Sequence, residues 1–121
     1  MTPESFVRAV EAHVGIPAVE SVVENLVNPP GRVPRPEDRE LSAWYAGLSE
    51  LDRERIISLI GKGAHAAIFG VLAVLDGVRT VDDEASTFEL VHVSTKRTLL
   101  NPPAICLHEE LRSEFLPGRS R

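Results

Sequence analysis

The chain has 121 residues and a mass of 13.2 kDa, the size of one domain that buries roughly two thirds of its unfolded surface. Its formal net charge of -5 disfavours nucleic acids and acidic membranes as partners, because both carry negative charge. The only cysteine, Cys106, cannot form an internal disulfide, and residues 1–14 lack the pattern of a leader peptide. We therefore expect a single cytoplasmic domain over residues 1–121 that meets a basic or neutral partner.

Two helices are predicted before residue 28. Pro3 suits the first turn of a helix, and apolar residues at helical spacing continue to about His13, with Gly15 as the stop. A second helix should begin near Pro17, because apolar residues again recur at helical spacing (Val19, Val22, Val23, Leu26 and Val27). The richness in valine leaves a strand as the alternative for this segment.

A proline-rich connector and a third helix follow. Residues 28–36 (NPPGRVPRP) hold four prolines and a glycine and cannot form a regular element. A stiff connector is favoured there over a polyproline ligand. Pro36 should occupy the first position of a helix whose apolar side holds Leu41, Trp44, Tyr45 and Leu48. Trp44 and Tyr45 are expected to pack in the core, and an interface role is the alternative.

The chain is organised around one long helix, from about residue 50 to Gly77. Ser49 is a good N-cap, and Gly77 can adopt the left-handed conformation that ends helices. The first half of this helix has one polar side, which ends at His65. Residues 66–75 are therefore apolar on every side of the helix. This run is too short and too interrupted for a bilayer span. We expect the domain to cover it on every side, with a second helix crossing at the glycines and alanines near Gly63 and Gly70.

The last third of the chain predicts an acidic loop and a hairpin. Residues 78–86 (VRTVDDEAS) predict an acidic loop with Asp82, Asp83 and Glu84, whereas residues 87–93 (TFELVHV) favour a strand. A short antiparallel return at residues 98–100 would complete a β-hairpin, which must rest on another element; we expect it against the long helix. A final short helix is expected over Leu107, Leu111 and Phe115, before a flexible tail at residues 117–121.

No catalytic, cofactor or metal site is predicted. His108, Glu109 and Glu110 resemble part of a zinc-binding helix, but the second histidine is replaced by Arg112. A lone cysteine is most often a small buried side chain. The acidic residues Asp82, Asp83 and Glu84, together with Asp76, lack the alternating order of a calcium loop. They indicate a solvated loop, with contact to a basic partner as the alternative.

The segments FGVLAVLDGV, FELVHV, LLN and LHEEL occur in this order between Leu41 and Phe115. In that order they resemble small bacterial proteins of uncharacterised families, in which an apolar helix ending in LDGV precedes a strand and a leucine-rich end. The resemblance implies an α+β fold and supplies no catalytic residues.

Together these features predict a mostly helical α+β domain with about five helices and one hairpin. The preferred function is stoichiometric binding of a protein partner, as in immunity or antitoxin proteins, through Asp82, Asp83, Glu84, Trp44 and Tyr45. One alternative is a small-ligand binder or enzyme with a pocket near His65 and His92. Another is a structural homodimer closed through the edge of the hairpin.

Overall fold

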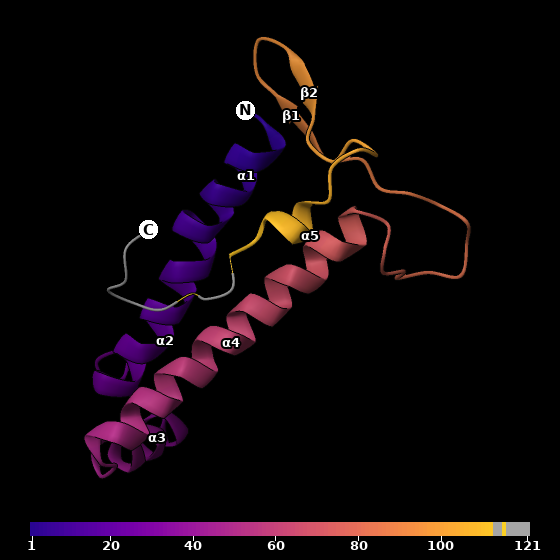
Figure 1. Ribbon diagram of the computed structural model, residues 1–121. Coiled ribbons are helices and arrows are strands. Elements are labelled where there is room, and N and C mark those ends of the chain that lie inside the picture. Colours follow the sequence, from indigo (N-terminus) through magenta and orange to yellow (C-terminus); the bar gives the residue numbers. More distant parts are fainter. Residues whose placement is uncertain (113–114, 116–121) are drawn as a thin grey trace.

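The computed structural model describes residues 1–112 and 115. It is mostly helical, with one two-stranded antiparallel sheet, and so has the predicted α+β character (Figure 1). The elements are α1 (Pro3–Val10), a π-helical segment (Glu11–Gly15), α2 (Ile16–Val27), α3 (Pro36–Ala46), α4 (Glu50–Leu75), β1 (Val91–Val93), β2 (Arg97–Leu99) and α5 (Leu107–Glu110). The predicted tail at residues 117–121 lies outside the described residues.

The first two predicted helices are one continuous helical run, so the expected count of about five helices differs slightly from the structure. Gly15 does not end a helix, since its φ of -65° and ψ of -58° are helical. The π-helical segment shifts the hydrogen bonds by one residue, and the amide of Ile16 donates to Glu11. This local shift accommodates Pro17, which has no amide hydrogen to donate.

The predicted starts of the next two helices are confirmed. The connector 28–35 is irregular, with Gly31 at a φ of +91°, and Pro36 occupies the first turn of α3. Ser49 caps α4, and its hydroxyl accepts a hydrogen bond from the amide of Asp52 at 3.1 Å. At the other end, Asp76 is the C-cap of α4, and Gly77 takes a φ of +80°, as its position predicted.

The core lies between the N-terminal helical run and α4, which are antiparallel (Figure 1). At one end Val7, Leu72 and Leu107 form a buried cluster. At the other end the buried residues Ile16, Val19 and Phe115 pack with the half-buried Ile60 and Ala64. Leu107, Leu111 and Phe115 therefore fill space between the two long helices, and between them they take part in both clusters.

One face of α4 is not covered, which corrects the expectation that residues 66–75 are enclosed on every side. Ala66 and Ala67 are exposed, and Leu59 and Val71 are 62% and 61% exposed. Among the described residues no helix crosses at the expected glycines: a Cβ built at Gly63 would meet nothing within 4 Å, and one at Gly70 would meet the guanidinium of Arg79. The helices that α4 does contact pack on its opposite face, where Gly61 and Leu72 are buried.

The length and composition of α4 are those of a helix that could cross a membrane. Its most apolar 18-residue window has a mean hydropathy of 1.7, and only 22% of that window is buried. Core helices of soluble proteins can be equally long and apolar. The expectation of a chain without membrane contact therefore stays a prediction.

The hairpin is shorter than predicted and lies beside the N-terminal end of α1 rather than along α4 (Figure 1). Val91 pairs with Leu99, His92 with Thr98, and Val93 with Arg97. Residues 87–90 are not part of the strand. Here the side chain of Asn101 bonds the backbone of Phe88 and Leu90 in place of a neighbouring strand.

Candidate functional site

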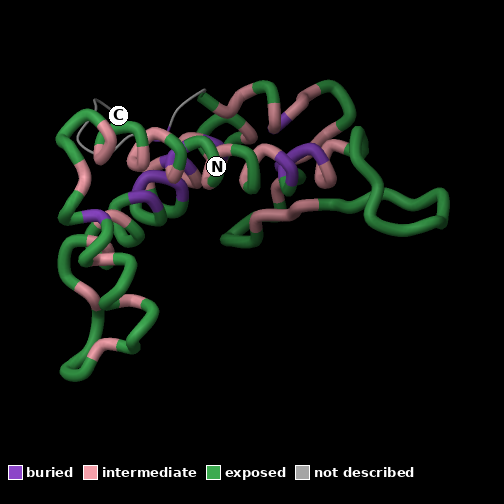
Figure 2. The backbone as a smooth tube through the Cα atoms, turned by 90° about the horizontal axis from the view of Figure 1, so that it is seen from below, coloured by how far each residue is buried: buried purple, intermediate pink, exposed green. Residues whose placement is uncertain are grey.

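The loop between α4 and β1 projects from the helical body. We call residues 77–88 the acidic loop; it extends away from α4 and is exposed throughout (Figures 1 and 2). It carries the predicted Asp82, Asp83 and Glu84, all exposed. The structure also exposes three large apolar side chains on the loop: Val78 at 64%, Val81 at 63% and Phe88 at 48%. Carboxylates and apolar side chains thus share one projecting surface.

Asn101 joins the two ends of the acidic loop. Its Nδ2 donates to the carbonyl of Leu75 at 2.7 Å and to that of Phe88 at 2.9 Å. Its Oδ1 accepts from the amide of Leu90 at 2.8 Å. One side chain therefore connects the end of α4 to the return of the chain toward β1. Within the loop, the hydroxyl of Ser86 donates to Asp82 at 3.1 Å, so the tip has its own local order.

Asp76 holds the start of the loop from the other side. Its carboxylate is only 1% exposed and accepts hydrogen bonds from the amides of Leu107 and His108, each at 2.9 Å. It also lies 2.6 Å from Nδ1 of His108. Since Leu107 and His108 begin α5, Asp76 caps this short helix while it ends α4. The last turn of α4, the loop and α5 are thus tied to one carboxylate.

The residues around Asp76 and His108 favour a structural role over nucleophilic catalysis. The ring of His108 packs edge-on against Phe69, with centroids 5.2 Å apart. Burial, followed by the charges of Glu109 and Asp76, raises the pKa of the Cys106 thiol above its usual value. A catalytic thiol needs the opposite shift, because the thiolate is the nucleophile.

The other two predicted partner-binding residues lie far from the acidic loop, on α3 at the opposite end of α4 (Figure 1). Tyr45 is buried, at 6% exposed, and the guanidinium of Arg53 lies 5.9 Å from its ring centroid. The prediction of core packing is confirmed for this residue. It is wrong for Trp44, which is 51% exposed. The indole is therefore available to a partner, but not together with the loop.

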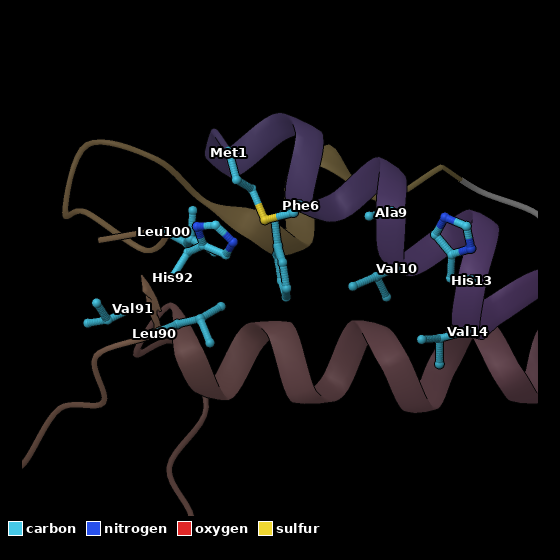
Figure 3. Close-up of a pocket in the computed structure, with 10 residues that line it drawn as sticks. All are labelled: Met1, Phe6, Ala9, Val10, His13, Val14, Leu90, Val91, His92 and Leu100. Carbon is cyan, nitrogen blue, oxygen red and sulfur yellow. The ribbon is translucent and has the colours of Figure 1, made fainter. Parts of the chain in front are cut away.

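An open apolar groove of about 360 Å³ lies between the N-terminal helical run and the hairpin (Figure 3). Phe6, Val10, Leu90 and Leu100 line it, with His92 at one end and His13 toward the other. His65 is not among its lining residues and instead lies against Phe69 and Phe115, with centroids 6.1 and 5.4 Å away. The groove thus holds one of the two histidines expected to share a pocket. Within residues 1–112 and 115, no three His, Cys, Asp or Glu side chains are grouped to hold a metal ion.

A buried carboxylate was missed by sequence reasoning. Glu11, at 4% exposed, lies in the π-helical segment with Oε1 2.9 Å from Nη1 of Arg8. Its Oε2 accepts from the amide of Arg112 at 2.7 Å, and Arg8 also bonds the carbonyl of Glu110. These contacts fix Glu110 and Arg112 onto the N-terminal helical run. In the sequence, the only signal was an acidic residue on an otherwise apolar helical side.

No family model, curated protein or solved structure matches this chain in the comparisons with known proteins. The resemblance to small bacterial proteins therefore stays a prediction. A functional proposal for this chain therefore rests on the geometry of the acidic loop and of the exposed helical faces.

Proposed function

We propose that this chain is a protein-binding module that binds a basic partner through its acidic loop in a stoichiometric complex. The observation that carries the proposal is the loop itself, which presents Asp82, Asp83 and Glu84 beside exposed Val78 and Val81. Charged groups steer a partner of opposite sign and fix its orientation. Apolar side chains beside them supply contact area. An inhibitor of the immunity or antitoxin kind works by this type of contact.

The way the loop is held supports the same proposal. Asn101 bonds the carbonyls at both ends of the loop, and Asp76 fixes its start to α5. Ordering a free loop on binding lowers affinity, by about 0.5–1.5 kcal/mol for each immobilised side chain. Fixed ends reduce that loss while the tip stays accessible. The loop thus meets a partner with part of its order already in place.

The test is to isolate the partner and then to neutralise the loop. Purified chain carrying a photo-crosslinking residue at Val81 should capture one predominant basic protein from its source cells. Calorimetry with that protein should give one-to-one binding that weakens as salt increases. The triple variant Asp82→Asn, Asp83→Asn, Glu84→Gln should then lower the affinity at least tenfold.

The matched control removes three exposed carboxylates elsewhere: Glu4→Gln, Glu40→Gln and Glu54→Gln. Its net charge equals that of the loop variant, so its affinity should stay within about twofold of the original if position matters. Equal losses in both variants would show that net charge alone is responsible. A partner whose affinity is unchanged by the loop variant would exclude the acidic loop as the binding site.

A second candidate function, binding of a small apolar ligand, is favoured by the groove in Figure 3. Its volume of about 360 Å³ falls within the usual range for ligand pockets. Val10→Trp would fill it from the helical side. If the groove binds ligands, an apolar fluorescent probe should bind the original chain and lose binding in Val10→Trp; equal binding by both would exclude the groove.

A further inference from the structure

The apolar groove between the N-terminal helical run and the hairpin has no acidic group in its wall. Among the described residues, those that line it include no Asp, Glu, Lys or Arg, although the chain has a net charge of -5. Its polar side chains are His92 at one end and His13 toward the other (Figure 3). An imidazole ring carries at least one N–H donor, whether neutral or protonated. The groove therefore offers an anion a donor at either end and no carboxylate to repel it.

One side of the hairpin forms a wall of the groove. His92 pairs with Thr98, and the amide of Leu100 donates to the carbonyl of Leu90 at 2.8 Å, two residues further along each strand. Alternate residues of a strand lie on the same side, so these four side chains share one side of the hairpin. The burial of the side chains agrees, since Leu100 is buried and the other three are half-buried, whereas Arg97 on the opposite side is exposed.

A basic residue continues this side toward the tip of the hairpin. The amide of Ser94 donates to the carbonyl of Lys96 at 2.9 Å, which extends the pairing of His92 with Thr98 by one step. Lys96 thus follows Thr98 on the groove side and is exposed. The sequence has no Asp or Glu between Glu89 and Glu109. This end of the groove therefore opens onto an imidazole, a hydroxyl and an ammonium group.

The other end of the groove lacks such a cation. His13 is exposed there on the helical run, but the sequence has no Lys or Arg between Arg8 and Arg32. Arg8 itself is engaged by the carboxylate of Glu11 at 2.9 Å. The two ends of the groove are therefore unlike, and only the hairpin end combines a donor with a positive charge.

We propose that the groove binds an amphipathic carboxylic acid, with its aliphatic tail along Phe6 and Val10 and its carboxylate at His92 and Lys96. The proposal deepens the second candidate function and rests on the groove being a ligand site. A hydrogen bond to an ionised carboxylate is stronger than one between neutral groups. Phe6 and Val14 are roughly 12 Å apart along the helix axis, close to the length of an extended decyl chain. The acidic loop takes no part in this contact.

The test is an NMR titration of the full chain with decanoate, decanol and decyltrimethylammonium, each below the concentration at which it forms micelles. Decanoate should bind about fivefold more tightly than the alcohol, and the cation should bind most weakly. The amides of Phe6, Val10 and Leu90 should shift as decanoate is added. Val10→Trp, which fills the groove, should remove these shifts for every probe.

Two charge reversals at neighbouring positions test the place of the carboxylate. Lys96→Glu and Arg97→Glu change the net charge equally, at exposed residues on opposite sides of the hairpin. Lys96→Glu should weaken the binding of decanoate about fivefold, whereas Arg97→Glu should keep it within about twofold. Both variants should keep the circular dichroism of the original chain, because both side chains are exposed.

Three results would overturn the proposal. One is equal affinity for all three probes, lost in Val10→Trp, which would leave the groove a site for apolar ligands without preference for an acid. Another is equal weakening by Lys96→Glu and Arg97→Glu, which would assign the effect to net charge. The third is the absence of shifts around the groove with any probe, which would exclude the groove as a ligand site altogether.

Discussion

The carboxylate of Asp76 lies 2.6 Å from Nδ1 of His108, thirty-two residues further along the chain. The same carboxylate accepts two backbone amides at the start of α5. The end of the longest helix and the start of the shortest therefore share one buried acceptor. These contacts fix α5 to the end of α4.

Removal of this acceptor should destabilise the fold. Asp76→Ala leaves two buried amides and the ring of His108 without their partner, and should lower the free energy of unfolding by about 3 kcal/mol. His108→Ala leaves both amide bonds in place and should lower it by about 1.5 kcal/mol. Urea denaturation followed by circular dichroism measures both. Equal losses would mean that the backbone bonds contribute little.

Asn101 should control the order of the acidic loop. Asn101→Ala removes the amide group that donates to the carbonyls of Leu75 and Phe88, together with the oxygen that accepts from the amide of Leu90. We expect the amide of Leu90, together with those at the two ends of the loop, to exchange with solvent about tenfold faster. Amides in the middle of α4 serve as the internal control and should change much less. Unaltered exchange at Leu90 would contradict the bridging role of Asn101.

Gly15 should not tolerate a side chain. A Cβ at this position would lie 2.8 Å from the ring of Phe115, which is fully buried, so neither group can move freely. Gly15→Ala should lower the free energy of unfolding by about 1–3 kcal/mol. In Gly47→Ala the new Cβ would make an ordinary contact of 3.5 Å with the carbonyl of Trp44. If this control loses as much stability as Gly15→Ala, the close packing of Phe115 is not the cause.

Cys106 should react slowly with iodoacetamide. Burial and the nearby carboxylates of Glu109 and Asp76 raise the pKa of its thiol, so little thiolate is present at neutral pH. The rate should continue to increase beyond pH 9, the ordinary pKa of the group. Glu109→Gln removes one negative charge and should increase the rate at pH 8. A rate that levels off below pH 8 would indicate an activated thiol instead.

The ends of helices were predictable because their signals are local. Ser49 and Gly77 mark α4 by the chemistry of single residues, and Pro36 marks the start of α3. Gly15 was misread for a tertiary reason. Its usual role as a helix stop is overridden by the π-helical segment and by the Phe115 ring that packs on it, and neither is visible in the local pattern.

The coverage of α4 could not be predicted, because a helix that is apolar all round does not reveal which side its neighbours take. The hydrophobicity of Ala66 and Val71 is the same whether domain, partner or lipid covers them. The acidic loop was recognised from its charges. The exposure of its apolar side chains is a property of the fold, and its attachment to Asn101 depends on residues more than ten positions away. The positions of the carboxylates were thus accessible to sequence reasoning, whereas the way they are presented was not.

Photo-crosslinking tests most directly the claim that the acidic loop is the binding surface. A photo-reactive residue at Val81, in the loop, should join the chain to a basic protein from its source cells. The same residue at Val33, which is 85% exposed in the connector between α2 and α3, should leave that protein free. Capture at Val33 with none at Val81 would contradict the account.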